Sequence, residues 1–155
     1  MKKWTREHAL DAIVSADGDG DRPLVSDENG LPVRGDLLGL VCAEFLKAKV
    51  VVTPVTSNSG IKPSKKCSIV RTRVGSPFVI AAMVEAVKSG KGAVMGFEAN
   101  GGVLTATDFI VNGSVLKALP TRDSFLPILA LLDKSARSGV PLSEVVADYR
   151  LPIAL

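Results

Sequence analysis

Residues 49–60 read K-V-V-V-T-P-V-T-S-N-S-G and carry the clearest structural signal in the chain. Three consecutive β-branched valines stop at Pro54, which is typical of a short buried strand that ends there. The polar residues 56–60 that follow are typical of a loop. The stretch therefore predicts a buried strand followed directly by a polar loop.

Outward from this strand, short apolar runs alternate with longer amphipathic stretches, the pattern of an α/β sandwich with a largely parallel sheet. Before it, we expect a strand over 11–16, a hairpin over 24–33 around Asn29-Gly30, and a helix from Gly35 to about Lys47 whose first N–H groups Asp36 caps. After it, we expect a short helix over 61–66, strands over 68–73 and 93–97, extended chain over 103–111, and helices over 76–89 and 123–137. A domain boundary is expected near residues 47–49.

The composition is that of a folded globular chain. Of 155 residues, 46% are hydrophobic and 23% are charged, and the mean hydropathy is +0.28. The longest apolar runs, such as residues 125–132, are interrupted by Pro127 and fall far short of the ~18 residues that a membrane span needs. Charged residues after Lys2 and Lys3 break any secretory signal, so a cytoplasmic location is expected, without a membrane partner.

The net charge and the low numbers of aromatic, histidine and cysteine residues argue against several classes of function. The net charge is +3 and the pI about 9.0, but one Trp and one Tyr give no basic-aromatic interleaving, which argues against a nucleic-acid partner. We interpret the basic residues between Lys47 and Arg73 as a solvated face, with an anionic small-molecule site as the alternative. With one histidine, His8, and no C-x-x-C spacing between Cys42 and Cys67, neither a Cys/His zinc site nor a Ser-His-Asp triad is expected.

The loop D-G-D-G-D-R at residues 17–22 places three carboxylates close together. Two like charges ~4 Å apart repel by about 4 kcal/mol at an effective dielectric near 20, so a cation is the natural remedy. On a straight strand Asp17 and Asp21 would lie ~13 Å apart, but Gly18 and Gly20 allow the loop to curl. Hard oxygen ligands favour Mg²⁺ or Ca²⁺. A solvated polar turn remains the alternative.

An EF-hand-like calcium loop starting at Asp17 fits less well than a magnesium loop. Glu28 matches the twelfth position, but Arg22 stands at the sixth, where an EF-hand needs glycine for a sharp turn. The Asn29-Gly30 turn also forbids the exiting helix. The better fit is a strand, loop and hairpin that hold Mg²⁺ beside a phosphate, with Arg22 as the phosphate's partner.

Four segments together resemble one enzyme superfamily, the α-D-phosphohexomutases, which includes phosphomannomutases and phosphoglucomutases. Residues 11–36, with the D-G-D-G-D-R core, the V-S-D-E-N-G hairpin and the G-D-L-L helix start, resemble its metal-binding loop. The later matches follow in the expected order and are T-P-V-T-S-N-S-G at 53–60, R-T-R-V-G-S-P-F at 71–78 and G-F-E-A-N-G-G at 96–102.

The resemblance implies a three-layer α/β/α sandwich with a mixed, mainly parallel sheet, of the phosphoglucomutase domain 3 type, preceded by a partial second domain. Residues 1–47 would be the end of domain 2 and residues 48–155 domain 3. The implied activity is interconversion of hexose 1-phosphate and hexose 6-phosphate, such as mannose or glucose phosphate, through a phosphoserine and Mg²⁺. By the same resemblance, Asp17, Asp19 and Asp21 would bind the metal and Arg22 would contact phosphate.

The segment 96–102 resembles the family's sugar-specificity loop. A carboxylate such as Glu98 can accept hydrogen bonds from two adjacent sugar hydroxyls, and the flanking glycines admit a ring closely; otherwise Glu98 is a surface turn acid. The family pattern G-E-x-S-G-H is altered here, with Asn100 for the serine and Gly102 for the histidine. Ser76 stands where another family histidine is frequent. Glu98, Asn100, Gly102 and Ser76 are therefore the substrate-binding candidates.

Two parts of the family's machinery have no counterpart in these 155 residues. No serine has T-A-S-H-N-P-like surroundings, and no R-x-S-x-T-E-P-like phosphate loop is present. We therefore expect no turnover by this chain alone, and expect the missing domains of the parent enzyme as partners. A partial second domain should also leave apolar sheet surface exposed, through which copies could associate. The alternative is a non-catalytic remnant or metal-binding module.

Overall fold

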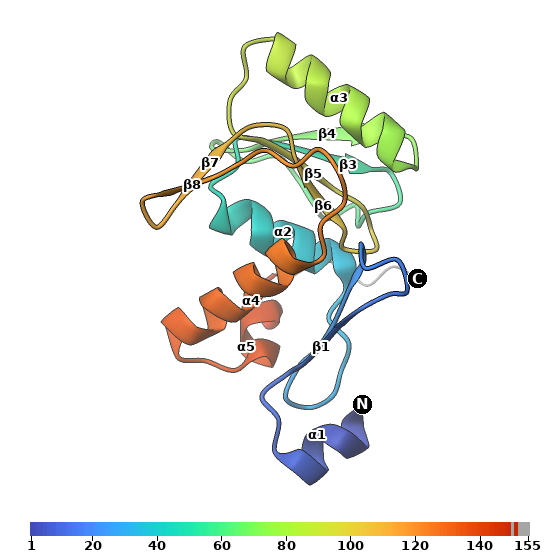
Figure 1. Cartoon of the computed structure of the whole chain (residues 1–155), viewed down its shortest axis with the longest axis vertical. Coiled ribbons are helices and arrows are strands. Elements are labelled where there is room, and N and C mark those ends of the chain that lie inside the picture. Colours follow the sequence, from blue (N-terminus) through green and yellow to red (C-terminus); the bar gives the residue numbers. More distant parts are fainter. Residues whose placement is uncertain (150, 152–155) are drawn as a thin grey trace.

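The computed structural model describes residues 1–149 and 151. Its helices are α1 (Lys2–His8), α2 (Gly35–Phe45), α3 (Ser76–Lys88), α4 (Phe125–Ser138) and α5 (Leu142–Ala147). Its strands are β1 (Ile13–Ala16), β2 (Pro23–Ser26), β3 (Val50–Pro54), β4 (Ser68–Thr72), β5 (Val94–Phe97), β6 (Val103–Thr105), β7 (Phe109–Val111) and β8 (Ser114–Leu116). Figure 1 shows their arrangement.

The main sheet has the strand order β4-β3-β5-β6. β3 pairs in parallel with β4 and with β5, so that Val52 lies opposite Val70 on one side and Gly96 on the other, and β6 is antiparallel to β5. All of β3 is buried, as its consecutive valines predict. The predicted mixed, mainly parallel sheet is confirmed.

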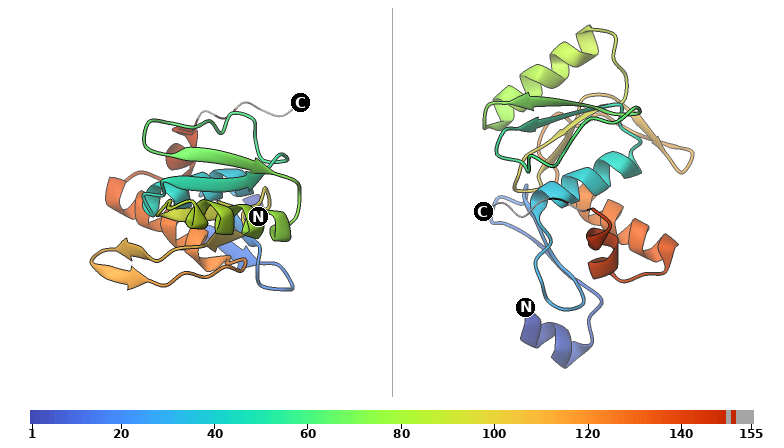
Figure 2. Two further views of the ribbon diagram at one scale, coloured as in Figure 1. Left: turned by 90° about the horizontal axis from the view of Figure 1, so that it is seen from above. Right: turned by 180° about the vertical axis from the view of Figure 1, so that it is seen from behind.

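Helices cover both faces of this sheet, with α3 on one side and α2 and α4 on the other (Figures 1 and 2). Close approach on both faces depends on glycine. A Cβ on Gly39 of α2 would lie 2.3 Å from the Phe97 ring, and a Cβ on Gly96 would lie 2.6 Å from Val79 of α3. The two helices therefore press directly on β5 from opposite sides, and the predicted three-layer sandwich is confirmed.

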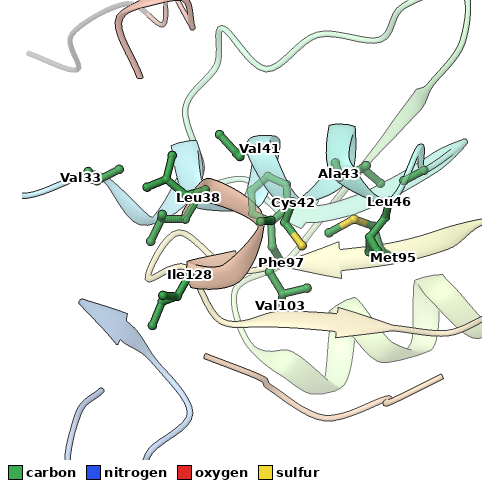
Figure 3. Close-up of a cluster of buried hydrophobic side chains, with 14 of the residues drawn as sticks. Val33, Leu38, Val41, Cys42, Ala43, Leu46, Met95, Phe97, Val103 and Ile128 are labelled. Carbon is green, nitrogen blue, oxygen red and sulfur yellow. The ribbon is translucent and has the colours of Figure 1, made fainter. Parts of the chain in front are cut away.

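The core has two parts because side chains alternate along β5. Met95 and Phe97 face the larger cluster with α2 and α4, which Figure 3 shows, whereas Val94 belongs to the smaller cluster with α3. Outside the main sheet, β1 and β2 form a separate antiparallel pair, and so do β7 and β8 around a turn at Asn112-Gly113.

Two local predictions are wrong. Residues 61–66 form no helix, because the Ile61 carbonyl that would begin it accepts a hydrogen bond from Arg71, and Pro63 removes a donor. Asp36 does not cap α2, since its carboxylate binds the side chain of Arg34 and the backbone N–H of Asn58. The predicted hairpin over 24–33 is present, with Asp27 N–H donating to the Leu31 carbonyl and Val33 N–H to the Val25 carbonyl across the turn, although β2 also pairs with β1 on its other side.

In the part of the chain that the structure describes, no helix has both the length and the apolar character needed to cross a bilayer.

Candidate functional site

The loops that carry the predicted site residues meet at one edge of the main sheet. Because β3, β4 and β5 are parallel, the loops after their carboxyl ends, residues 55–60, 73–75 and 98–102, leave the sheet at the same edge. Open α/β sheets bind ligands at this edge. The acidic loop 17–22 reaches the same place, where the Ser124 hydroxyl donates to the Gly20 carbonyl at 2.7 Å.

The acidic loop is a closed turn between β1 and β2. The backbone N–H of Asp17 donates to the Arg22 carbonyl at 3.1 Å, and Gly20, in the left-handed region with φ 76°, donates to the Asp17 carbonyl at 3.0 Å. Across the turn, Arg22 Nε lies 3.3 Å from Asp17 Oδ2. Gly20 thus closes the turn, whereas Gly18 has no positive φ, and Arg22 folds back onto its own loop.

The carboxylates of this loop suit a hard cation chemically, but they are not gathered into a cage. Among the described residues, no group of three or more His, Cys, Asp or Glu side chains is arranged to hold a metal. Asp17 and Asp21 are paired with arginines, and Asp19 is exposed. Asp21 Oδ1 is buried and accepts no hydrogen bond from the described residues. It lies 3.7 Å from Arg22 Nε, so the donor set fits Mg²⁺ in ligand type, but a cation would have to displace arginines from it.

The loop after β5 is a second tight turn. Glu98 and Gly102 are joined by a backbone hydrogen bond of 3.0 Å, and the Asn100 side-chain oxygen accepts the Gly102 N–H at 3.0 Å. Glu98 is buried, whereas Asn100 is exposed. The start of α2 packs against this turn, because a Cβ on Gly35 would lie only 2.4 Å from the backbone of Asn100.

Arg122 joins the two loops, and no sequence motif predicts it. Its Nη2 lies 2.5 Å from Asp21 Oδ2, and its Nη1 donates to Glu98 Oε2 at 3.3 Å. The position of Arg122 follows from the bridge between Asp123 and Val103 at the start of β6. This long-range pairing is not visible in the sequence, where residues 121–124 are a polar lead into α4. The structure therefore brings two predicted sites into one.

A family model identifies the protein family to which this chain belongs. The family model described as phosphoglucomutase/phosphomannomutase, alpha/beta/alpha domain III matches residues 34–151, most of the chain. The chain belongs to the phosphoglucomutase/phosphomannomutase family.

Curated family members match almost the whole chain. It is 59% identical over 155 residues to a phosphomannomutase of Sinorhizobium fredii, covering all of this chain and 33% of that protein. It is 49% identical over 144 residues to a phosphomannomutase of Salmonella muenchen, covering 92% and 30%. A solved family structure from Burkholderia thailandensis has a TM-score of 0.71 at 21% identity, covering 99% of this chain and 31% of that one, which supports the fold alone. The chain thus spans about a third of the length of these relatives.

The two remaining substrate-binding candidates, Ser76 and Gly102, lie at the same edge of the sheet but have different neighbours. Ser76 is half-buried as the first residue of α3, behind Gly75 with φ 121°. No hydrogen bond joins Ser76 to the acidic loop or to Glu98 among the described residues. Gly102 is buried beside the acidic loop, since a Cβ there would lie 3.1 Å from the Asp21 carbonyl oxygen.

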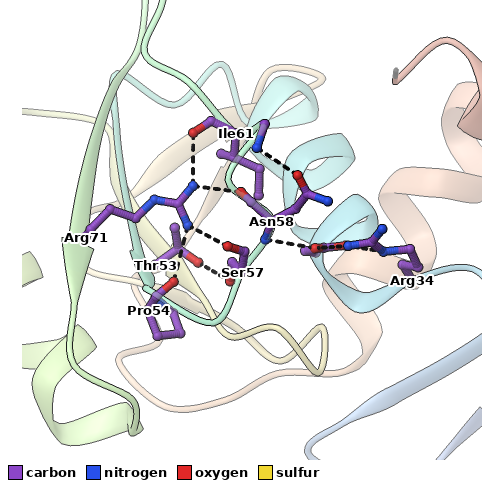
Figure 4. Close-up of polar contacts among 9 residues, drawn as sticks. Arg34, Thr53, Pro54, Ser57, Asn58, Ile61 and Arg71 are labelled. Atoms are coloured by element: carbon purple, nitrogen blue, oxygen red, sulfur yellow. Dashed lines mark hydrogen bonds and ion pairs between the residues drawn. The ribbon is translucent and has the colours of Figure 1, made fainter. Parts of the chain in front are cut away.

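The loop after β3 is a rigid support (Figure 4). The Arg71 guanidinium donates to the carbonyls of Pro54, Ser57, Asn58 and Ile61 at 2.8 to 3.2 Å. The Ser57 hydroxyl is buried at 2.7 Å from the Thr53 hydroxyl. This network fixes residues 54–61 beside the site, and it uses Ser57 for support.

Proposed function

We propose that this chain is the metal-loop and sugar-loop part of a phosphohexomutase that interconverts hexose 1-phosphate and hexose 6-phosphate through a phosphoserine. Residues 1–47 would contain the end of the second domain and residues 48–155 the bulk of the third. Because α2 packs on the main sheet and the domain III family model begins at residue 34, the boundary itself would fall before α2. The observation that carries the proposal is the Arg122 bridge, because it sets the acidic loop and Glu98 side by side, where one phosphosugar could contact both. The 59% identity to a phosphomannomutase supports mannose phosphate among the substrates.

In this proposal Asp17, Asp19 and Asp21 hold Mg²⁺. When bound, Mg²⁺ would neutralise charge on a transferring phosphoryl group. Arg22 would contact the phosphate from the other side of the loop. Its side chain is 48% exposed and, among the described residues, is held by carboxylates of the same loop, so it can turn to a ligand without opening the core.

Glu98 would select the sugar by accepting hydrogen bonds from its hydroxyls. Burial limits its freedom, and Arg122 already occupies one of its oxygens, so the carboxylate is oriented before a ligand arrives. Asn100, Gly102 and Ser76 are the neighbouring candidates for contacts with the sugar phosphate.

Turnover should require the phosphoserine and phosphate-binding domains, which are the partners we propose for this chain. The purified chain is assayed with mannose 1-phosphate or glucose 1-phosphate, a hexose bisphosphate primer and Mg²⁺. We expect no product from the chain alone. Activity proportional to the purified chain would contradict the proposal.

Metal binding is tested separately by following the thermal midpoint during a Mg²⁺ titration, because a ligand of the native state must raise that midpoint. We expect a rise at millimolar Mg²⁺ that Asp19→Ala abolishes, with Asp11→Ala as a control carboxylate outside the loop. If Mg²⁺ does not raise the thermal midpoint of the unaltered chain, the alternative is favoured, in which the chain keeps the fold but does not bind the metal.

Two further proposals concern self-association of the chain and its location in the cell. Val14 and Leu24 of the β1–β2 pair expose much of their side chains, as does Trp4, so copies could associate through this small sheet. Sedimentation velocity over a range of concentrations checks this. We also propose a cytoplasmic location, which is consistent with two free cysteines, Cys42 and Cys67.

A further inference from the structure

Arg122 places a single guanidinium between carboxylates that are distant in the sequence. It pairs with Asp21 on the acidic loop and with Glu98 on the sugar loop. The three side chains are mostly shielded from water, with exposed fractions of 26% for Arg122, 21% for Asp21 and 9% for Glu98. Ion pairs in such surroundings are screened less by solvent and salt than surface pairs.

The position of Arg122 is fixed by contacts on either side. The next residue, Asp123, exchanges two backbone hydrogen bonds with Val103, of 2.8 and 3.1 Å, and Ser124 donates to the Gly20 carbonyl at 2.7 Å. Gly102 leaves room for the Arg122 stem, because a Cβ there would lie 3.2 Å from Arg122 Cδ. The guanidinium is therefore held where it can reach both carboxylates.

We propose that Arg122 is a positioning residue that couples cation binding on the acidic loop to the state of Glu98, an inference that rests on the proposed metal role of that loop. A divalent cation on Asp17, Asp19 and Asp21 competes with Arg122 for the Asp21 carboxylate. Once displaced from Asp21, the guanidinium has Glu98 as its remaining partner. Cation occupancy and the charge balance at Glu98 then change together.

The coupling has a defined sign in each direction. Removing the Arg122 charge removes a competitor for Asp21 and should tighten cation binding. Neutralising Glu98 leaves Arg122 entirely to Asp21 and should weaken cation binding, although Glu98 is not a ligand in this scheme. By linkage, a ligand that draws Arg122 toward Glu98 would favour the cation by the same factor as the cation favours that ligand.

The test measures Mn²⁺ binding to the folded chain by electron paramagnetic resonance, with Mg²⁺ as competitor. We expect R122M to bind Mn²⁺ about tenfold more tightly, the change that ~1.4 kcal/mol produces, and E98Q to bind it severalfold more weakly. In the R122M background, E98Q should change the affinity less than twofold. R137M removes an exposed arginine that pairs with Asp133 on α4, and as a matched control it should leave Mn²⁺ affinity unchanged.

Each outcome separates the coupling from the metal site itself. If Mn²⁺ binds and E98Q weakens binding equally with and without Arg122, the coupling is wrong while the metal site stands. If no variant binds Mn²⁺, the metal role is wrong and the coupling is wrong with it. Thermal melts without metal establish that each variant folds. Should R122M not fold, R122K takes its place, because one ammonium cannot span both carboxylates. In the R122K background, E98Q must then change the Mn²⁺ affinity less than it does in the unaltered chain.

Discussion

Replacing Gly35 with alanine should destabilise the fold, although alanine is the better helix former. Gly35 is the first residue of α2, and its backbone does not have a positive φ. The obstacle is the sugar loop. An added Cβ would lie 2.4 Å from the carbonyl carbon of Asn100 and from the nitrogen of Gly101, and these are backbone atoms that cannot rotate away.

The expected loss of stability can be worked from this overlap. Ordinary contact begins at 3.4 Å, so α2 and the loop must separate by about 1 Å. Overpacking of this kind costs about 1–3 kcal/mol, and the helix propensity of alanine offsets at most about 1 kcal/mol. We therefore expect a net loss of roughly 2 kcal/mol, which in a chain of this size lowers the thermal midpoint by roughly 4–8 °C.

Thermal unfolding followed by circular dichroism measures this loss, with Gly92→Ala as the matched control. A Cβ on Gly92 meets no atom within 4 Å, so that variant should stay within about 0.5 kcal/mol of the unaltered chain. Amide spectra should show shifted signals for residues 98–102 in Gly35→Ala and unchanged signals for β3. If the two variants melt together, the loop is not packed against α2 as described.

Two other substitutions and one measurement of thiol reactivity test the support of the site and the packing of α2. Arg71→Met removes a donor from four carbonyls, of which those of Pro54 and Asn58 still accept a backbone N–H, and should lower the free energy of unfolding in urea by about 3 kcal/mol, with Arg71→Lys intermediate. Burial would raise the pKa of Glu44, but hydrogen bonds from Tyr149 and Lys134 hold that pKa below its ordinary value. Glu44→Gln should therefore be less stable than the unaltered chain at pH 7, and the difference should shrink as the pH falls below the ordinary glutamate pKa and Glu44 becomes protonated. Burial raises the pKa of Cys42, so its thiol should react with Ellman's reagent only after unfolding.

The parts of the fold that sequence predicts well are those set by neighbouring residues. The strand at 50–54 follows from consecutive valines, and the helix at 76–88 follows from its apolar stripe and the polar chain after it. The false helix at 61–66 and the false cap at Asp36 fail for the opposite reason. In both cases a polar group found a partner elsewhere in the chain, with Arg71 taking the Ile61 carbonyl and Asn58 giving its N–H to Asp36.

The same division holds at the site. Asp17 to Arg22 and Glu98 stand out as separate motifs because each is a local cluster of unusual residues. Their proximity depends on Arg122, which reaches them only because Asp123 pairs with Val103 at the start of β6. A single arginine in a polar segment carries no signal of that pairing. The sequence therefore predicted the two loops but not the contact that joins them.

The site edge and the core are held together by different forces. Beneath the edge, Phe97 and its neighbours form a close-packed apolar cluster that tolerates little movement. At the edge, the loops are held mainly by three arginines, Arg22, Arg71 and Arg122, each bound to oxygen atoms. Arg71 binds backbone carbonyls, which a ligand cannot replace without unfolding the loop. Arg22 and Arg122 bind carboxylates, and in these ion pairs a cation can replace the arginine or a phosphate can replace the carboxylate. The loops that should respond to ligands are thus the ones held by exchangeable ion pairs, beside a loop that Arg71 fixes through its backbone carbonyls.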